Sequence, residues 1–109
     1  MLSRKRIVCF LLITLTAAHA HAGDAEGPIL DLWASPISNF VMFTIDDPKA
    51  KWHRCNTSGR YAIDVLAPGG RATLEVLLLA KRLDLVLYVK SLNTCNQYDA
   101  ENARHIIVH

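Results

Sequence analysis

The stretch Cys55–Lys81, CNTSGRYAIDVLAPGGRATLEVLLLAK, decides the fold that this sequence predicts. Its segment RYAIDVL (60–66) alternates apolar and polar residues, which is the pattern of a half-buried β-strand. The residues APGG (67–70) end that strand with a proline and two glycines, which are typical of a tight turn. The residues RATLEVLLLAKRLD (71–84) have a strongly helix-forming composition. The stretch therefore predicts a strand, a turn and one helix in succession.

Further strands are predicted on both sides of this stretch. They are ILDLWA (29–34), NFVMFTI (39–45), LVLYVK (85–90) and ARHIIVH (103–109). We expect GDAEGP (23–28) to be a flexible start, KWHRC (51–55) to be a short strand or a loop, and SLNTCNQYDAEN (91–102) to be a polar loop. The predicted order β-β-β-α-β-β describes a mainly β protein with one helix. It is the order of an OB-fold, a small Greek-key barrel, although other arrangements of one helix on a sheet share it.

The N-terminal residues have the pattern of a secretory signal peptide. Three basic residues at 4–6 precede an apolar run, Ile7–Thr16, that is too short to cross a bilayer as a helix. The tripeptide AHA then occurs at 18–20 and at 20–22, and each copy suits a signal-peptide cleavage site. We expect a signal peptide at 1–22, cleavage after Ala22, and a single OB-like domain at 23–109.

The charge of the segment that follows this signal differs from that of the whole chain. It contains nine Lys and Arg against ten Asp and Glu, so its net charge is about −1. Such a balance argues against nucleic acid as a partner. No second apolar run is long enough to span a membrane, so we expect a secreted or periplasmic protein with no membrane span after cleavage.

Two cysteines, Cys55 and Cys95, remain after the signal, and we expect them to form a disulfide. The alternative is a redox or metal-binding pair. A CxxC motif is absent, and His53 beside Cys55 would supply only two ligands without a predictable third. We therefore predict no metal and no cofactor.

A disulfide between these cysteines would bring together two loops that contain aromatic and polar residues. Four of them, Trp52, His53, Asn96 and Tyr98, would then lie at one end of the domain. Such a cluster on loops is a candidate ligand-binding patch, and incidental exposure in a loop is the alternative. We predict a protein without enzymatic activity, because no set of residues is arranged as catalytic groups are.

The helical segment has more leucines than one buried face needs. Leu74, Leu77 and Leu78 are expected to form the core stripe. A second group, Val76, Leu79 and Leu83, lies on another side of the helix and predicts a contact with another subunit or with a covering loop.

The pattern C-x4-R-Y-A-I-D-x4-G-G-R-A (55–72), followed by a Leu/Ala-rich helix, LYV and TC, resembles a group of small exported bacterial proteins. These are similar to the B subunits of AB-type toxins, particularly the subtilase cytotoxin B-subunit type. The resemblance implies an OB-fold, assembly into a pentamer with the helices around a central pore, and recognition of host glycans.

Two hypotheses on function stay open. The first is an exported, non-enzymatic OB-like domain that binds a glycan or a protein as a homo-oligomer. The second is a monomeric periplasmic or envelope accessory protein without a glycan ligand.

Overall fold

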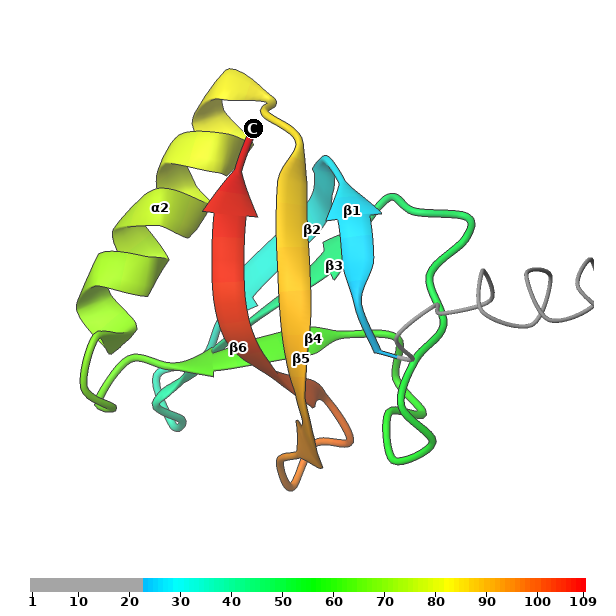
Figure 1. Ribbon diagram of the computed structural model, residues 1–109. Coiled ribbons are helices and arrows are strands. Elements are labelled where there is room, and N and C mark those ends of the chain that lie inside the picture. The colour runs from blue at the N-terminus through cyan, green and yellow to red at the C-terminus, as the bar shows by residue number, and fades with distance from the viewer. Residues whose placement is uncertain (1–22) are drawn as a thin grey trace, which may run out of the picture.

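The computed structural model describes residues 23–109 as one β-sheet of six strands and one helix (Figure 1). The elements are β1 (Ala25–Gly27), β2 (Ile29–Ala34), β3 (Phe40–Ile45), β4 (Tyr61–Asp64), α2 (Gly70–Leu83), β5 (Leu87–Cys95) and β6 (Glu101–Val108). The predicted class, mainly β with one helix, is confirmed. The predicted signal peptide at 1–22 lies outside the described residues.

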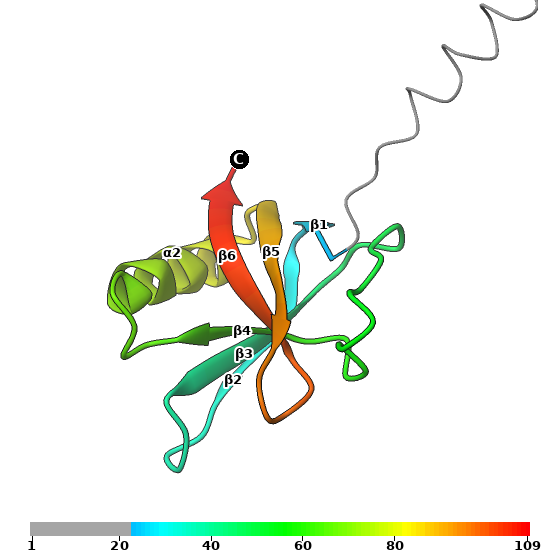
Figure 2. The same ribbon diagram turned by 60° about the horizontal axis from the view of Figure 1, so that its bottom comes forward.

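The sheet curls because one N-terminal segment supplies the strands at both of its ends, β1 and β2. The strand order is β1-β5-β6-β4-β3-β2, in which β4 and β6 are parallel and the other neighbours are antiparallel. β1 and β2 stand at opposite ends of that order, yet only Pro28 separates them along the chain. Asp46 donates its backbone N–H to the carbonyl of Pro28, which holds this bend against the end of β3. The sheet is consequently a curled half-barrel rather than a flat layer (Figure 2).

The first strand corrects the prediction of a flexible start at 23–28. Ala25 is buried and pairs with Val89 of β5. Gly27 lies against the backbone of Asp46, and a Cβ at this position would overlap that backbone. β1 is therefore held in place mainly by close contacts of its main chain, and its sequence lacks the apolar side chains that usually indicate a strand.

The fifth and sixth strands correct the prediction of a polar loop at 91–102. β5 continues to Cys95, and β6 already begins at Glu101. The pairing of these strands shifts register twice, between Lys90 and Ser91 and again before Cys95. Because such bulges interrupt the two-residue alternation, this half of β5 lacks the pattern that predicts a strand.

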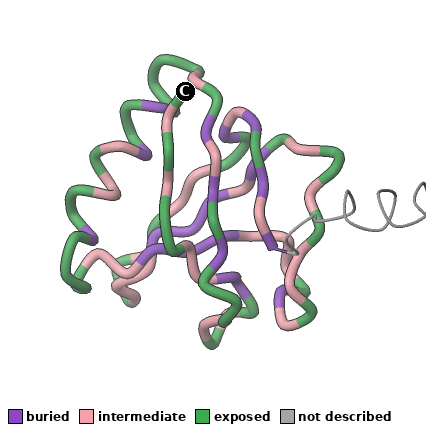
Figure 3. The backbone as a smooth tube through the Cα atoms, viewed as in Figure 1, coloured by how far each residue is buried: buried purple, intermediate pink, exposed green. Residues whose placement is uncertain are grey.

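Cross-strand neighbours form a row that faces the interior. Leu32, Phe43, Tyr61 and Glu101 follow one another across β2, β3, β4 and β6. Phe43, Tyr61 and Glu101 are fully buried. Figure 3 shows that the buried residues follow the strands and one side of α2, whereas the loops consist mostly of intermediate and exposed residues.

The helix packs with one side on the interior of the curled sheet. Leu77 and Ala80 are buried in the main core cluster, and Leu74 packs against it. Leu78 was expected in this core stripe but is 43% exposed, so that part of the prediction is wrong. The buried centre of the helix lies between Leu77 and Ala80, and Leu78 points too far to one side to reach the core.

The turn at 67–70 requires glycine at two of its positions. Gly69 has a φ of 76°, a left-handed conformation that favours glycine. Gly70 begins α2 so close to the backbone of Asp64 and Val65 that a Cβ would overlap it. The PGG sequence therefore lets the helix start directly beside the strand that precedes it.

Candidate functional site

The disulfide joins the loop before β4 to the end of β5. Cys55 and Cys95 are bonded, with their Cα atoms 6.0 Å apart, as the sequence predicts. This bond tethers the segment at 51–60 to the turn at 96–100 between β5 and β6. A disulfide is typical of oxidising compartments, which include the periplasm and the exterior of the cell.

Trp52 and His53, two of the four predicted ligand-binding residues, lie against the interior. The Trp52 ring packs edge-on against Tyr61, with ring centroids 5.4 Å apart. His53 donates its backbone N–H to Glu101 Oε1 at 3.0 Å, and its Nδ1 lies 3.2 Å from Cys55 Sγ. Trp52 therefore packs against the main core, and His53 is held to the buried side chain of Glu101.

Asn96 and Tyr98, the other two predicted residues, belong to the turn between β5 and β6. Asn96 Oδ1 accepts the backbone N–H groups of Tyr98 at 2.9 Å and Ala100 at 3.2 Å. The Tyr98 ring packs edge-on against Phe40, with centroids 6.4 Å apart, in a second and smaller apolar cluster. The two predicted aromatic residues, Trp52 and Tyr98, thus lie in different apolar clusters.

This second cluster forms an aromatic surface on the outer side of the sheet. At its centre Met42, Ala62 and Ala100 are buried. Trp33, Phe40 and Tyr98 pack around them and stay partly exposed. We use the name aromatic surface for these three aromatic residues together with Arg60.

Arg60 connects Trp33 and Tyr98 within the aromatic surface. Its guanidinium lies 5.4 Å from the centroid of the Trp33 ring, which is the geometry of a cation–π contact. It also donates to the backbone carbonyl of Tyr98 at 3.3 Å. The surface therefore combines immobilised, partly exposed rings with a positive charge, a combination that suits a polar ligand with apolar faces.

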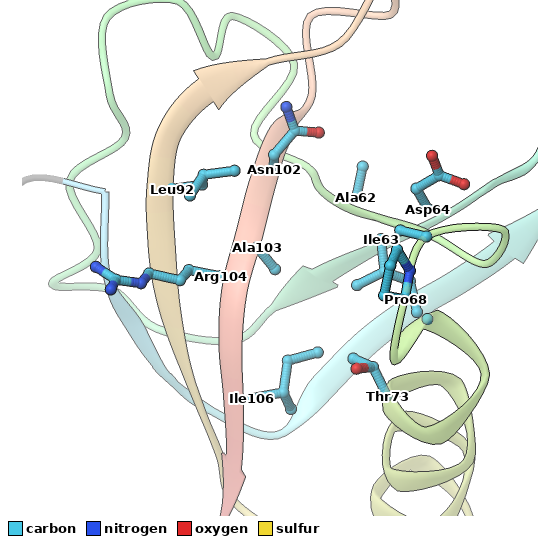
Figure 4. A pocket seen from close by; sticks show the side chains of 12 residues that line it. Ala62, Ile63, Asp64, Pro68, Thr73, Leu92, Asn102, Ala103, Arg104 and Ile106 are labelled. Carbon is cyan, nitrogen blue, oxygen red and sulfur yellow. The ribbon is translucent and has the colours of Figure 1, made fainter.

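A pocket of about 210 Å³ lies next to the second cluster, because Ala62 belongs to that cluster and also lines the pocket (Figure 4). β4 and β6 pair only at Tyr61–Glu101 and Ala62–Asn102, so the pocket opens where these two strands diverge. Its polar side chains are Asp64, Thr73, Asn102 and Arg104. Asp64 is already engaged, because it accepts hydrogen bonds from the side chain of Asn39 and from the backbone N–H of Leu66.

A buried polar centre beneath the disulfide was not predicted. Glu101 is 0% exposed, and its Oε1 accepts from Asn56 Nδ2 at 3.2 Å as well as from His53. Beside it, the Tyr61 hydroxyl donates to the carbonyl of Gly23. Burial raises the pKa of Tyr61 well above its usual value, and the negative charge of Glu101 raises it further. Glu101 has no sequence signal, because a carboxylate in a polar stretch is normally solvated.

The part of the chain covered by the structure shows two further properties. Between residues 23 and 109, no three His, Cys, Asp or Glu side chains lie close enough together to hold a metal ion. Over the same range, no helix combines the length and the apolar character that crossing a membrane would require.

Comparisons with protein-family models, with curated proteins and with solved structures find no match to this chain.

Proposed function

We propose that this protein is an exported, non-enzymatic domain that binds a glycan through its aromatic surface. The observation that carries the proposal is the contact between Arg60 and the partly exposed ring of Trp33, with Phe40 and Tyr98 beside them. Flat aromatic rings bind the apolar faces of sugars, and an adjacent cation and amides bind their hydroxyl or carboxylate groups. Because the rings rest on a sheet, little conformational entropy would be lost when a ligand binds.

We assign the curled sheet to the OB-fold class as part of this proposal. If β1 and β2 are counted as one bent strand, the chain has five strands, with the helix between the third and the fourth. The bent strand then pairs with the second and the fourth strand, and the third and fifth are parallel neighbours. This connectivity supports a five-stranded Greek-key barrel.

Export and glycan recognition have further support in the sequence. The signal-like N-terminus and the disulfide both favour an oxidising compartment. The resemblance of residues 55–95 to the subtilase cytotoxin B-subunit type favours a glycan as the ligand.

The first test is the Trp33→Ala variant. After the ligand is identified on a glycan array, we expect this variant to bind it about tenfold more weakly or worse, because a stacked aromatic ring is lost. The dissociation constant should be measured by titration calorimetry. Leu30→Ala is the matched control, since Leu30 is an exposed apolar residue on the same strand, outside the aromatic surface.

The Trp33 test has two outcomes that would contradict the proposal. An array on which the protein binds no glycan would favour the monomeric accessory protein instead. Equal affinities of the Trp33→Ala and Leu30→Ala variants would place the ligand elsewhere on the molecule.

We also propose that the protein forms a homo-oligomer through one side of α2. Ala72, Val76, Leu79 and Leu83 follow one another at alternating intervals of four and three residues, which places them in one stripe. Leu79 is 48% and Leu83 57% exposed, and Val76 is half-buried. A stripe with this spacing suits a second helix, and a second copy of the chain offers the same stripe, so we expect α2 of one subunit to pack against α2 of the next.

The oligomer is tested by Leu79→Glu, which places a charge in the middle of this stripe. We expect the wild-type protein to sediment as an oligomer at micromolar concentration and this variant to sediment as a monomer, because a carboxylate would have to be desolvated in the contact. Leu78→Glu is the control, since Leu78 is similarly exposed on the other side of the helix. A monomeric wild-type protein in analytical ultracentrifugation would refute the assembly.

A further inference from the structure

The carboxylate of Glu101 is only half satisfied. Its Oε1 accepts hydrogen bonds from His53 and Asn56, whereas its Oε2 is buried and has no hydrogen-bond partner in residues 23–109. Within residues 23–109, the structure contains one side-chain ion pair, between His109 and Glu26 on the surface, and it does not involve Glu101. An ionised carboxylate buried without a cation is costly, so Oε2 requires a donor, and preferably a charged one.

The unpaired oxygen faces Gly23. A Cβ on Gly23 would overlap Glu101 Oε2 and would lie 3.0 Å from Ser91 Oγ. Since the backbone nitrogen is bonded to the same α-carbon, it lies within about 5 Å of Oε2. This nitrogen also donates to the carbonyl of Lys51. Three acceptors, the oxygens of Lys51, Ser91 and Glu101, therefore surround the backbone of one buried glycine.

Gly23 directly follows the AHA tripeptide at 20–22, where we expect signal cleavage. A signal peptidase would add water across the Ala22–Gly23 peptide bond. The carbonyl carbon of Ala22 becomes a carboxylate, and the nitrogen of Gly23 becomes an amine that takes up a proton at neutral pH. The new group carries a positive charge and three N–H donors, where the peptide had a single neutral donor.

We propose that the α-ammonium group of Gly23, created by cleavage after Ala22, is the missing partner of Glu101. It forms a buried ion pair with Oε2 and keeps its hydrogen bond to Lys51. This pair links the start of the mature chain to β6, beside the Tyr61 hydroxyl, which donates a hydrogen bond to the Gly23 carbonyl. The link forms only after processing, so removal of the signal itself stabilises the fold of the exported protein.

The first experiment locates the new N-terminus and measures its accessibility. The full-length precursor is expressed in an exporting bacterial host, and the intact mass of the product should correspond to a chain that starts at Gly23. A second precursor carries Ser-Gly inserted between Ala22 and Gly23. An amine-reactive ester should label the N-terminal α-amine of the processed wild-type protein about tenfold more slowly than the N-terminal α-amine of the processed insertion variant. A chain that starts elsewhere, or equal labelling rates, would overturn the proposal.

The second experiment tests whether Glu101 is the partner. The insertion should lower the folding equilibrium constant, measured by urea unfolding, by about tenfold or more, which corresponds to about 1.4 kcal/mol. In the Glu101→Gln background the insertion should change it by less than about twofold, because the ion pair is already lost. Glu26→Gln is the control carboxylate, since Glu26 pairs with His109 on the surface, and the insertion should keep its full effect there. Equal effects of the insertion with and without Glu101 would exclude the pair. If Glu101→Gln does not fold, the labelling rates decide the question.

Discussion

Replacement of both Cys55 and Cys95 by alanine should lower the free energy of unfolding by about 4 kcal/mol. The two cysteines are 40 residues apart, and the loop that they close contains β4, α2 and almost all of β5. Without the bond, the unfolded chain gains the entropy of this open loop. A small domain has a total stability of only about 5–15 kcal/mol, so the change would be a large part of it.

Urea unfolding of the protein, followed by tryptophan fluorescence, measures this change. Reduction of the wild-type protein with dithiothreitol should lower the midpoint to that of the double variant, while the double variant itself should not respond to the reductant. A loss of less than about 1 kcal/mol in the double variant would show that the disulfide does not constrain the unfolded chain.

Leu77→Ala should cost about 2–5 kcal/mol, because it leaves a cavity in the main core cluster. Leu77 is fully buried, and it is the side chain by which the centre of α2 packs into the curled sheet. Its neighbours belong to strands that are distant in sequence, so they cannot close the space without moving the sheet.

Leu79→Ala is the matched control, because it removes the same atoms from the same helix at a position that is 48% exposed. We expect it to change the stability by less than about 0.5 kcal/mol at a concentration where the protein is monomeric. Similar losses in the two variants by thermal unfolding would mean that α2 packs on the sheet with a different face.

The strand, turn and helix of residues 60–84 could be predicted from the sequence because their signals are local. Alternation in the strand, PGG in the turn and leucines in the helix each describe a few neighbouring residues. β1 and the second half of β5 were missed for the opposite reason. Gly27 is placed in a strand by its close contact with Asp46, and the register shifts beside Ser91 remove the alternation.

The candidate site was predictable only in part. The cysteine count correctly predicted a disulfide, and this implied that the loops near Trp52 and Tyr98 would meet. Which side of the sheet each ring would face was not predictable, and the two rings lie in different clusters. Trp33 and Arg60, which now form the centre of the candidate site, are 27 positions apart and meet only because β2 and β4 flank the same strand.

The sequence by itself thus determined the class of fold, the disulfide and a helix with more apolar surface than one face requires. These features depend on composition and on the spacing of near neighbours, which a single sequence displays. Only the tertiary structure decided that Trp52 packs against the core, that Trp33 lies under Arg60, and that Glu101 is buried beside Gly23. Those contacts depend on strand register and on the bend at Pro28, which bring distant segments together. The sequence around each segment does not indicate which distant segment it will contact.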